Sequence, residues 1–171
     1  MAVKGWFAVS LLAFVLTATP ASAQSTYFSL QCNSDDWVLS LPYDVLSCDE
    51  SSDSVNTDFQ LYDLDGGSFE DGDTIALAAV NVAETNLVSV DLYGGSPLDT
   101  WFDDQSNPTN DEKFIVENLD CDSCQIGDGS RISLQSVSLG KFWSAAGCGG
   151  GAVNATATSR GSCEAFEIKI Y

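Results

Sequence analysis

The chain has 171 residues, with 25 acidic and six basic side chains, no histidine, and a formal net charge of −19. A surface this negative repels nucleic acid and anionic lipid, so we expect no nucleic-acid partner and only weak attraction of divalent cations. Because histidine is absent, the Ser-His-Asp and Cys-His mechanisms are excluded as they are usually built.

The N-terminal 23 residues have the layout of a secretory signal peptide. Lys4 supplies the positive region, Trp6–Leu16 the apolar core, and Ala21–Ala23 the small-residue cleavage site. The apolar core is shorter than the ~20 residues that span a bilayer, which favours cleavage over a retained anchor. We therefore expect a secreted, extracellular chain that begins near Gln24 and is not inserted in a membrane. Loss of Lys4 would leave five basic residues against 25 acidic ones, a formal charge of −20.

Short apolar runs separated by clusters of Gly, Ser, Asn and Asp predict β-strands in the rest of the chain, where helical periodicity is weak. The runs fall into three groups of four, which predicts an all-β chain of twelve short strands. In chain order, the expected strands lie in Tyr27–Cys32, Trp37–Ser40, Leu46–Cys48, Asp58–Leu61, Ile75–Ala78, Leu87–Ser89, Gly94–Thr100, Phe114–Val116, Ile132–Gln135, Gly140–Ser144, Ala152–Ala155 and Glu164–Ile168.

The three groups are copies of one repeat. Their phenylalanines are 55 and 52 residues apart, and a period near 50 with four strands indicates repeated units that share one core. Propellers usually need four or more blades, so three units favour a pseudo-threefold β-trefoil. We expect one domain over residues 24–171, with repeats at about 24–66, 67–120 and 121–171. The aligned positions are Leu30, Leu77 and Leu134; Ser40, Ser89 and Ser144; Leu46, Leu98 and Val153; Phe59, Phe114 and Phe166.

The third repeat contains an apolar triplet, a Gly-Lys-aromatic turn that ends on Ser, a Gly-rich loop, a Val-x-Ala strand and an acidic-x-Phe close. These lie at Ile132–Leu134, Gly140–Ser144, Gly147–Gly151, Val153–Ala155 and Glu164–Phe166. This layout resembles the repeat of the fascin-like (actin-crosslinking-like) β-trefoil family, and it is weaker in the two upstream repeats. The resemblance implies the fold. It does not extend to actin bundling, which requires a cytosolic protein with basic patches.

The six cysteines all follow the expected signal peptide, and an even count in an exported chain predicts three disulfides. The Cys-x-x-Cys spacing has no histidine and no βαβ pattern around it, so a structural loop closure is favoured over a zinc or redox motif. Two cysteines share the inward phase of their strands, and two others flank the third strand of the last repeat. The predicted pairs are Cys32–Cys48, Cys121–Cys124 and Cys148–Cys163.

Aromatic rings beside polar groups are the most informative feature for binding, because a sugar has an apolar face and a hydroxylated rim. Trp143 aligns with core leucines and is expected in the core. Trp37 aligns with Lys141, a turn position that should face solvent, and Trp101 is out of phase with its inward neighbours. Rings that merely cap the barrel remain the alternative. The candidate ligand-binding residues are Trp37, Tyr43, Tyr93, Trp101, Asp36 and Asp103.

These features predict a monomeric, non-catalytic module without a cofactor, which binds an extracellular polysaccharide or glycoprotein of a wall or matrix. An extracellular protein-interaction or structural role, such as a matrix component, inhibitor or effector, is the alternative. A glycoside hydrolase with paired carboxylates comes third, because among 25 acidic residues neighbouring carboxylates are expected on a solvated surface without any catalytic role. The acidic segment Asp63–Asp73 lacks EF-hand spacing, so no metal site is predicted. Asn154 begins an Asn-x-Thr acceptor and is the expected glycosylation site.

Overall fold

The computed structural model describes residues 26–33, 35–39, 45–54, 56–80, 86–90, 98–102 and 107–171. For residues 26, 39, 99, 101 and 102 only the backbone is described. The expected signal peptide, residues 1–23, lies outside the described residues, and so do Tyr43, Tyr93 and Asp103. Across the described ranges, no helix has the length and apolar character needed to cross a membrane.

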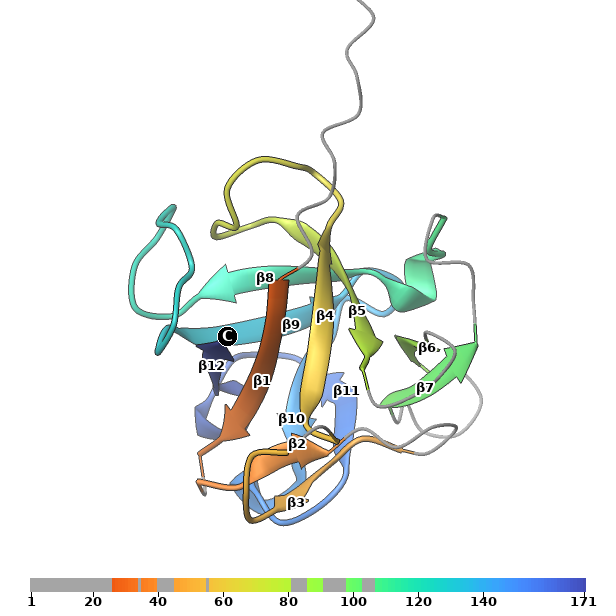
Figure 1. Cartoon of the computed structure of the whole chain (residues 1–171), viewed down its shortest axis with the longest axis vertical. Coiled ribbons are helices and arrows are strands. Elements are labelled where there is room, and N and C mark those ends of the chain that lie inside the picture. Colours follow the sequence, from red (N-terminus) through yellow and green to blue (C-terminus); the bar gives the residue numbers. More distant parts are fainter. Residues whose placement is uncertain are drawn as a thin grey trace, which may run out of the picture.

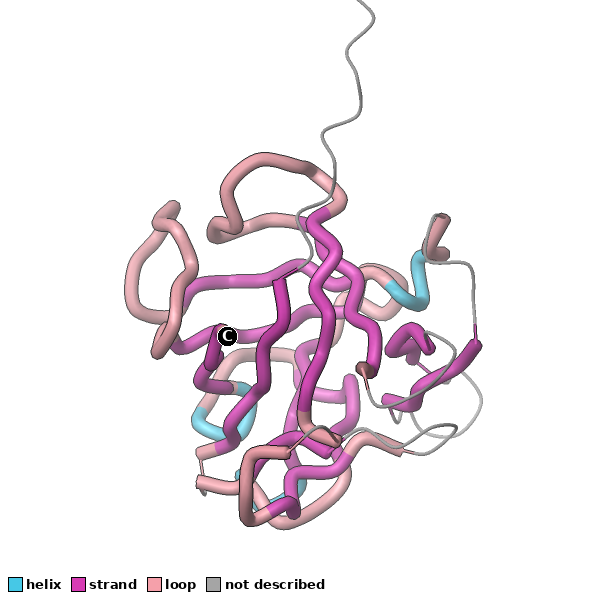
Figure 2. The backbone as a smooth tube through the Cα atoms, viewed as in Figure 1, coloured by secondary structure: helices cyan, strands magenta, loops and turns pink. Residues whose placement is uncertain are grey.

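Strands make up most of the described chain, and the only helices there are three single turns of 3-10 type (Figures 1 and 2). Each strand expected from the sequence overlaps one observed strand, which confirms an all-β fold. The elements are β1 (Thr26–Cys32), β2 (Trp37–Leu39), β3 (Ser47–Glu50), β4 (Asp58–Asp63), β5 (Thr74–Ala79), β6 (Asn86–Val90), β7 (Leu98–Phe102), η1 (Asn110–Glu112), β8 (Phe114–Asn118), β9 (Arg131–Ser136), β10 (Phe142–Ala145), η2 (Ala146–Cys148), β11 (Val153–Ala157), η3 (Ser162–Glu164) and β12 (Phe166–Ile170).

Six strands close into an antiparallel barrel. β1 pairs with β4, β4 with β5, β5 with β8, β8 with β9, β9 with β12, and β12 returns to β1. The other six form the hairpins β2–β3, β6–β7 and β10–β11, each inserted in sequence between two barrel strands. This arrangement is β-trefoil-like, and closure leaves no open edge in the barrel. The loops β4–β5 and β8–β9 lie at the opposite end of the barrel from the β2–β3 hairpin (Figure 1).

The three hairpins meet through the aligned residues of their second strands. The Leu46 amide donates to the Leu98 carbonyl at 2.7 Å, and the Val153 amide donates to the Leu46 carbonyl at 2.8 Å. All three side chains are fully buried. Equivalent positions of the three groups therefore contact one another at one end of the barrel.

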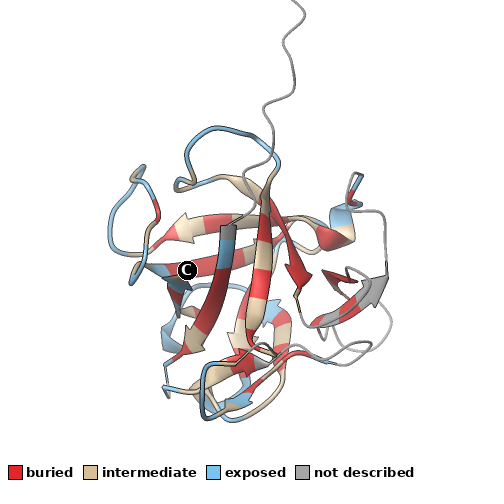
Figure 3. Cartoon of the chain, viewed as in Figure 1, coloured by how far each residue is buried: buried red, intermediate tan, exposed pale blue. Residues whose placement is uncertain are grey.

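Buried side chains alternate with more exposed ones along β8 and β12, as in a half-buried strand, whereas Ile75–Ala79 of β5 are all buried (Figure 3). The aligned leucines and phenylalanines are all fully buried. Trp143 is likewise fully buried, which confirms its expected place in the core. Its ring meets Phe114 edge-on at 4.9 Å between centroids and Phe166 at 6.3 Å, the T-shaped geometry that aromatic pairs favour.

Two residues of the fascin-like layout are joined inside this core. The Ser144 hydroxyl donates to Glu164 Oε1 at 2.6 Å, and only 9% of Glu164 is exposed. A buried carboxylate needs such a partner, because an unpaired one loses its hydration without compensation. The serine and the acidic residue of the layout thus serve the fold.

The six cysteines form the three pairs expected from the sequence. Cys32–Cys48 joins β1 to β3, Cys121–Cys124 closes a loop between β8 and β9, and Cys148–Cys163 joins the turns on either side of β11. Cys32 and Cys48 are buried, as their inward phase predicted, whereas Cys121 is exposed.

The strand register corrects the alignment of the first repeat. Gln31 pairs with Trp37, and its counterpart Gln135 pairs with Phe142. Trp37 therefore corresponds to Phe142 and not to Lys141, because the turn after the first strand is one residue shorter in the first repeat. Trp37 stands in a strand and is half-buried, so the expectation of a solvent-facing turn position was wrong.

Candidate functional site

Four side chains form a row across the outer face of four neighbouring strands. The register places Trp37 of β2 beside Gln31 of β1, Gln31 beside Glu167 of β12, and Glu167 beside Arg131 of β9. Side chains opposite one another in antiparallel strands lie about 4.5–5.5 Å apart at Cβ. This outer row, Trp37–Gln31–Glu167–Arg131, therefore brings an indole ring, an amide, a carboxylate and a guanidinium together.

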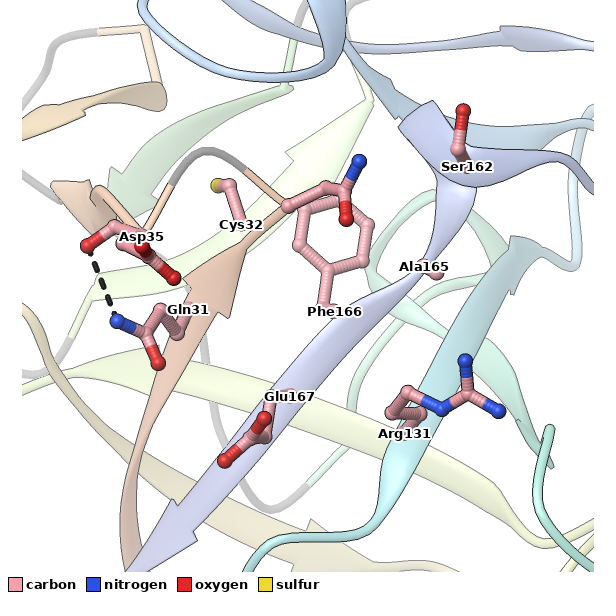
Figure 4. A pocket seen from close by; sticks show the side chains of 9 residues that line it. Gln31, Cys32, Asp35, Arg131, Ser162, Ala165, Phe166 and Glu167 are labelled. Atoms are coloured by element: carbon pink, nitrogen blue, oxygen red, sulfur yellow. Dashed lines mark hydrogen bonds between the residues drawn. The ribbon is translucent and has the colours of Figure 1, made fainter.

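The surface is hollowed on both sides of this row. One hollow has a volume of about 190 Å³ and lies over Cys32, Ala165 and Phe166 (Figure 4). A second, of about 250 Å³, reaches from Trp37 to Lys169. Gln31 and Glu167 line both hollows, so the two are parts of one shallow depression, which we call the β1–β12 groove.

The turn between β1 and β2 fixes one wall of the groove. Gln31 Nε2 donates to the Asp35 carbonyl at 3.0 Å, which leaves the amide oxygen of Gln31 available (Figure 4). The Cys32 amide donates to the Asp36 carbonyl at 2.7 Å, and the Asp35 amide donates to the Cys32 carbonyl at 3.1 Å. The buried Cys32–Cys48 disulfide lies beneath. Together these bonds hold Gln31 and Trp37 in position.

The opposite wall is a turn fastened along β12. Asp128 Oδ1 accepts a hydrogen bond from the Ile170 amide at 3.1 Å, and the Gly129 amide donates to the Ile168 carbonyl at 2.8 Å. Gly129 has φ of +79°, a backbone conformation that glycine adopts without strain. Asp128 is thereby placed at the rim of the second hollow.

Both cations of the groove are held by acids. Arg131 bonds to Asp120 through Nε at 2.8 Å and through its terminal nitrogen at 2.7 Å. The hydrogen bonds from the Arg131 amide and side chain lower the pKa of Asp120. Lys169 Nζ lies 3.9 Å from Asp53 Oδ2 and 5.5 Å from the centroid of the Trp37 ring, a cation–π distance. Glu167 takes part in none of the ion pairs among the described residues.

A polar cluster beside the groove orients the partner of Lys169. The buried Ser29 hydroxyl lies 3.0 Å from Asp53 Oδ1 and 3.1 Å from Asp58 Oδ1, and the Tyr171 hydroxyl donates to Asp53 Oδ2. Burial, together with the charge of Asp53, raises the pKa of Asp58, although the hydrogen bond from Ser29 opposes the rise. Asp53 is therefore fixed by the hydroxyls of Ser29, Thr57 and Tyr171, and it holds Lys169 over the Trp37 ring.

Of the residues predicted as a site, Trp37 lines the groove, and the half-buried Asp36 lies in the adjoining turn, where its backbone carbonyl accepts from the Cys32 amide. The backbone of Trp101 lies in β7, paired with Leu87 of β6, so Trp101 belongs to a different hairpin from Trp37. The side chain of Trp101 is outside the described residues. Tyr43, Tyr93 and Asp103 also fall outside them. The predicted set is thus not shown as one cluster.

The sequence reasoning missed most of the groove. Gln31 and Glu167 are each flanked by inward-facing residues, so strand alternation alone indicated that they point outward. The signal that was lacking is the pairing of β1 with β12, strands from opposite ends of the domain.

Two carboxylates of the acidic segment Asp63–Asp73 accept hydrogen bonds from the backbone of the same segment. Asp63 Oδ1 accepts hydrogen bonds from the amides of Asp65 at 3.0 Å and Gly66 at 2.9 Å, and Asp73 Oδ2 accepts one from Glu70 at 2.7 Å. No group of three or more Cys, Asp or Glu residues in the described ranges is arranged to hold a metal ion.

The expected glycosylation site, Asn154, lies on β11. It is half-buried, and its side-chain amide donates to the Ala152 carbonyl at 3.3 Å. Modification at Asn154 stays a prediction.

No family model matches the chain, and no curated protein matches its sequence. Among solved structures, it is similar to the SDF2-like protein from Arabidopsis thaliana, with a TM-score of 0.64 and 12% identity, over 85% of this chain and 93% of that one. It is similar to ThreeFoil, a designed 3-fold symmetric protein, with a TM-score of 0.63 and 15% identity, over 84% and 97% of the two chains. It is also similar to a protein O-mannosyltransferase complex of S. cerevisiae, Pmt1-Pmt2 bound to the sugar donor, with a TM-score of 0.67 and 11% identity, over 87% of this chain and 25% of that one. These likenesses place the chain among β-trefoil-like all-β folds.

Proposed function

We propose that this chain is a secreted, non-catalytic module that binds carbohydrate in the β1–β12 groove. The observation that carries the proposal is the outer row, which sets a half-buried indole ring beside an amide, a carboxylate and a guanidinium. A sugar offers an apolar face to the ring and hydroxyls to polar groups that are already oriented, which is the composition of a small-molecule site.

Three members of the outer row, together with Lys169 beside it, have distinct parts in the proposed binding. The Trp37 ring stacks on a sugar face, the Gln31 amide oxygen and the Glu167 carboxylate accept hydrogen bonds from hydroxyls, and Lys169, which lies over the ring, donates to hydroxyls. The groove favours neutral or amino-bearing glycans over acidic ones. Its two cations are already paired with Asp120 and Asp53, whereas Glu167 adds a negative charge.

The comparisons support the choice of carbohydrate without showing it. One similar structure belongs to a complex named as a protein O-mannosyltransferase bound to the sugar donor. At 11% identity this likeness concerns the fold, and fold alone does not carry function.

The proposal also includes export of the chain, a pseudo-threefold symmetry of its fold, and a relation to the fascin-like family. Three disulfides are compatible with an oxidising, extracellular compartment, in line with the signal peptide expected at residues 1–23. The thrice-repeated order of barrel strand, hairpin and barrel strand supports a pseudo-threefold β-trefoil of three repeats. The repeat layout supports a relation to the fascin-like family for the fold only.

The test is binding of the secreted chain to β-1,4-linked hexamers of glucose, N-acetylglucosamine and glucosamine, with a galacturonic acid hexamer as the acidic arm. We expect at least one of the first three to bind and the acidic hexamer not to bind. Trp37→Ala should weaken binding at least about tenfold, or ~1.4 kcal/mol.

Trp37→Tyr is the matched control, because it keeps a ring in the same place and should retain most of the affinity. Melting temperatures of all variants exclude a folding defect. Failure of every neutral and amino-bearing hexamer to bind, or equal affinities of Trp37→Ala and the parent chain, would overturn the proposal.

A further inference from the structure

A second aromatic patch lies on the same outer face as the groove. Tyr27 on β1 is 45% exposed, and Tyr171, directly after β12, is 59% exposed, which makes it the most exposed large hydrophobic side chain in the described ranges. The Tyr171 amide donates to the Tyr27 carbonyl at 3.1 Å, so the two residues are neighbours on adjacent strands.

Strand alternation puts this patch in line with the groove. On β12, the outward positions after Glu167 are Lys169 and then Tyr171; on β1, the outward positions before Gln31 are Ser29 and then Tyr27. The patch therefore continues the groove along the paired strands β1 and β12, away from Arg131 and toward the C-terminal end of β12.

One ammonium group bridges the two aromatic regions. Lys169 Nζ lies 5.5 Å from the Trp37 ring centroid and 5.9 Å from the Tyr171 ring centroid. The two rings are thus no farther apart than the sum of these distances, which is within the reach of one sugar chain of several units. No third aromatic ring is needed to connect them.

The Tyr171 ring is anchored although it is exposed. Its hydroxyl donates to Asp53, which Ser29 and Thr57 also hold, at 3.0 Å and 2.9 Å. A ring fixed in this way presents apolar area with little loss of conformational entropy on binding.

We propose that Tyr171, with Tyr27 beside it, is a second sugar subsite, so that the ligand is a linear chain of several sugar units running along β12 from Trp37 to Tyr171. This inference rests on the proposed function of the groove. Two weak stacking contacts made by one chain reinforce each other, because the first raises the effective concentration at the second. A sugar that ends after one or two units reaches only the Trp37 subsite.

The patch suits a sugar chain better than a protein partner. A stable protein interface buries about 1,200–2,000 Å² and has an apolar centre. Here, single rings alternate with the charged groups of Lys169, Asp53 and Glu167, which matches a ligand whose apolar faces alternate with hydroxyls.

The test is the dependence of affinity on chain length, measured by calorimetry with β-1,4-linked dimers and hexamers of glucose and of N-acetylglucosamine. We expect the parent chain to bind a hexamer at least about tenfold more tightly than the matching dimer. Tyr171→Ala should remove this gain, while its dimer affinity should equal that of Tyr171→Phe, which loses the same hydroxyl bond to Asp53. Trp37→Ala should weaken dimer and hexamer alike.

Tyr171→Phe is the matched control, since it keeps the ring and removes only the hydroxyl, and hexamer affinity should stay within about threefold. Equal affinities of dimer and hexamer for the parent chain, or an equal loss for both in Tyr171→Ala, would overturn the second subsite while the groove itself stands. If neither sugar binds at any length, the proposed function fails and this inference fails with it.

Discussion

Asp71 shows how a single half-buried acid can join separate segments of the fold. Its Oδ1 accepts a hydrogen bond from the Asn118 amide at 2.7 Å and its Oδ2 one from the Ser123 amide at 3.0 Å, while its own amide donates to the Cys124 carbonyl at 3.1 Å. The hydrogen bond from Ser123, then that from Asn118, and last the charge of Arg160 lower the pKa of Asp71, against an opposing effect of burial. The folded state therefore favours the ionised, carboxylate form of Asp71.

Asp71→Asn is expected to lower the free energy of unfolding at pH 7 by about 1 kcal/mol, because one of two charge-assisted bonds is lost. A carboxyl group with a lowered pKa in the folded state stabilises it above the unfolded pKa of about 4 and stops doing so as the pH falls through the lowered value. The difference between variant and parent should therefore shrink as the pH falls below about 4 and vanish once the pH is below the lowered pKa of Asp71. Urea unfolding at several pH values measures this; a difference that does not change with pH would contradict it.

At this scale the sequence predicted which tryptophan is buried but not how Trp37 is placed. Trp143 could be assigned to the core because it takes the position of a core leucine in the repeat. Trp37 was misplaced by one position because the turn before it is one residue shorter than its counterpart, and an alignment without gaps cannot detect this. The residues that hold Lys169 and Arg131 were not predicted, since those partners depend on tertiary contacts.

At the scale of the elements, the Cys32–Cys48 disulfide cross-links the strands beneath the groove. It joins β1 to β3 across a separation of 16 residues, and Cys32 lies beneath the hollow lined by Gln31 and Phe166. Cys121–Cys124 spans three positions and is exposed at Cys121. In the chain-entropy description, the longer loop closure stabilises the fold more.

Replacement of both Cys32 and Cys48 by Ser is expected to cost about 3 kcal/mol of unfolding free energy and to weaken sugar binding, because the turn that carries Gln31 loosens. The matched variant with Ser at 121 and 124 should cost less and leave binding unchanged. Chemical denaturation and calorimetry on the two double variants make the comparison. Equal losses of binding in both would show that the bridge has no special relation to the groove.

Strand positions were predictable because each strand carries its own apolar pattern, and every expected strand overlaps an observed one. The local irregularities in strand pairing could not be predicted from the sequence. The register shifts between Trp37 and Val38 and again between Phe142 and Trp143, whereas β6 and β7 pair without such a shift. These bulges insert a residue that repeat alignment alone cannot place, so the outward or inward direction of nearby side chains was unreliable.

At the scale of the whole molecule, the candidate site is a product of barrel closure. β1 and β12 are the first and last described strands, and their pairing brings Gln31 and Tyr27 beside Glu167 and Tyr171. The sequence predicted the β-trefoil, which implies such a closure, but not the register that aligns Gln31 with Glu167. The net charge of −19 acts on the same scale, because it disfavours approach of acidic polymers to any face.

The most direct measurement is a titration of the isotope-labelled chain with the glucose or N-acetylglucosamine hexamer, in which NMR spectra record the amide and indole chemical shifts. The largest shifts should fall on the Trp37 indole and on the amides of Gln31, Glu167 and Lys169, and extend to Tyr171. Shifts confined to the loops β4–β5 and β8–β9, at the opposite end of the barrel from the β2–β3 hairpin, or no shifts with either hexamer, would contradict a sugar-binding groove on β1 and β12.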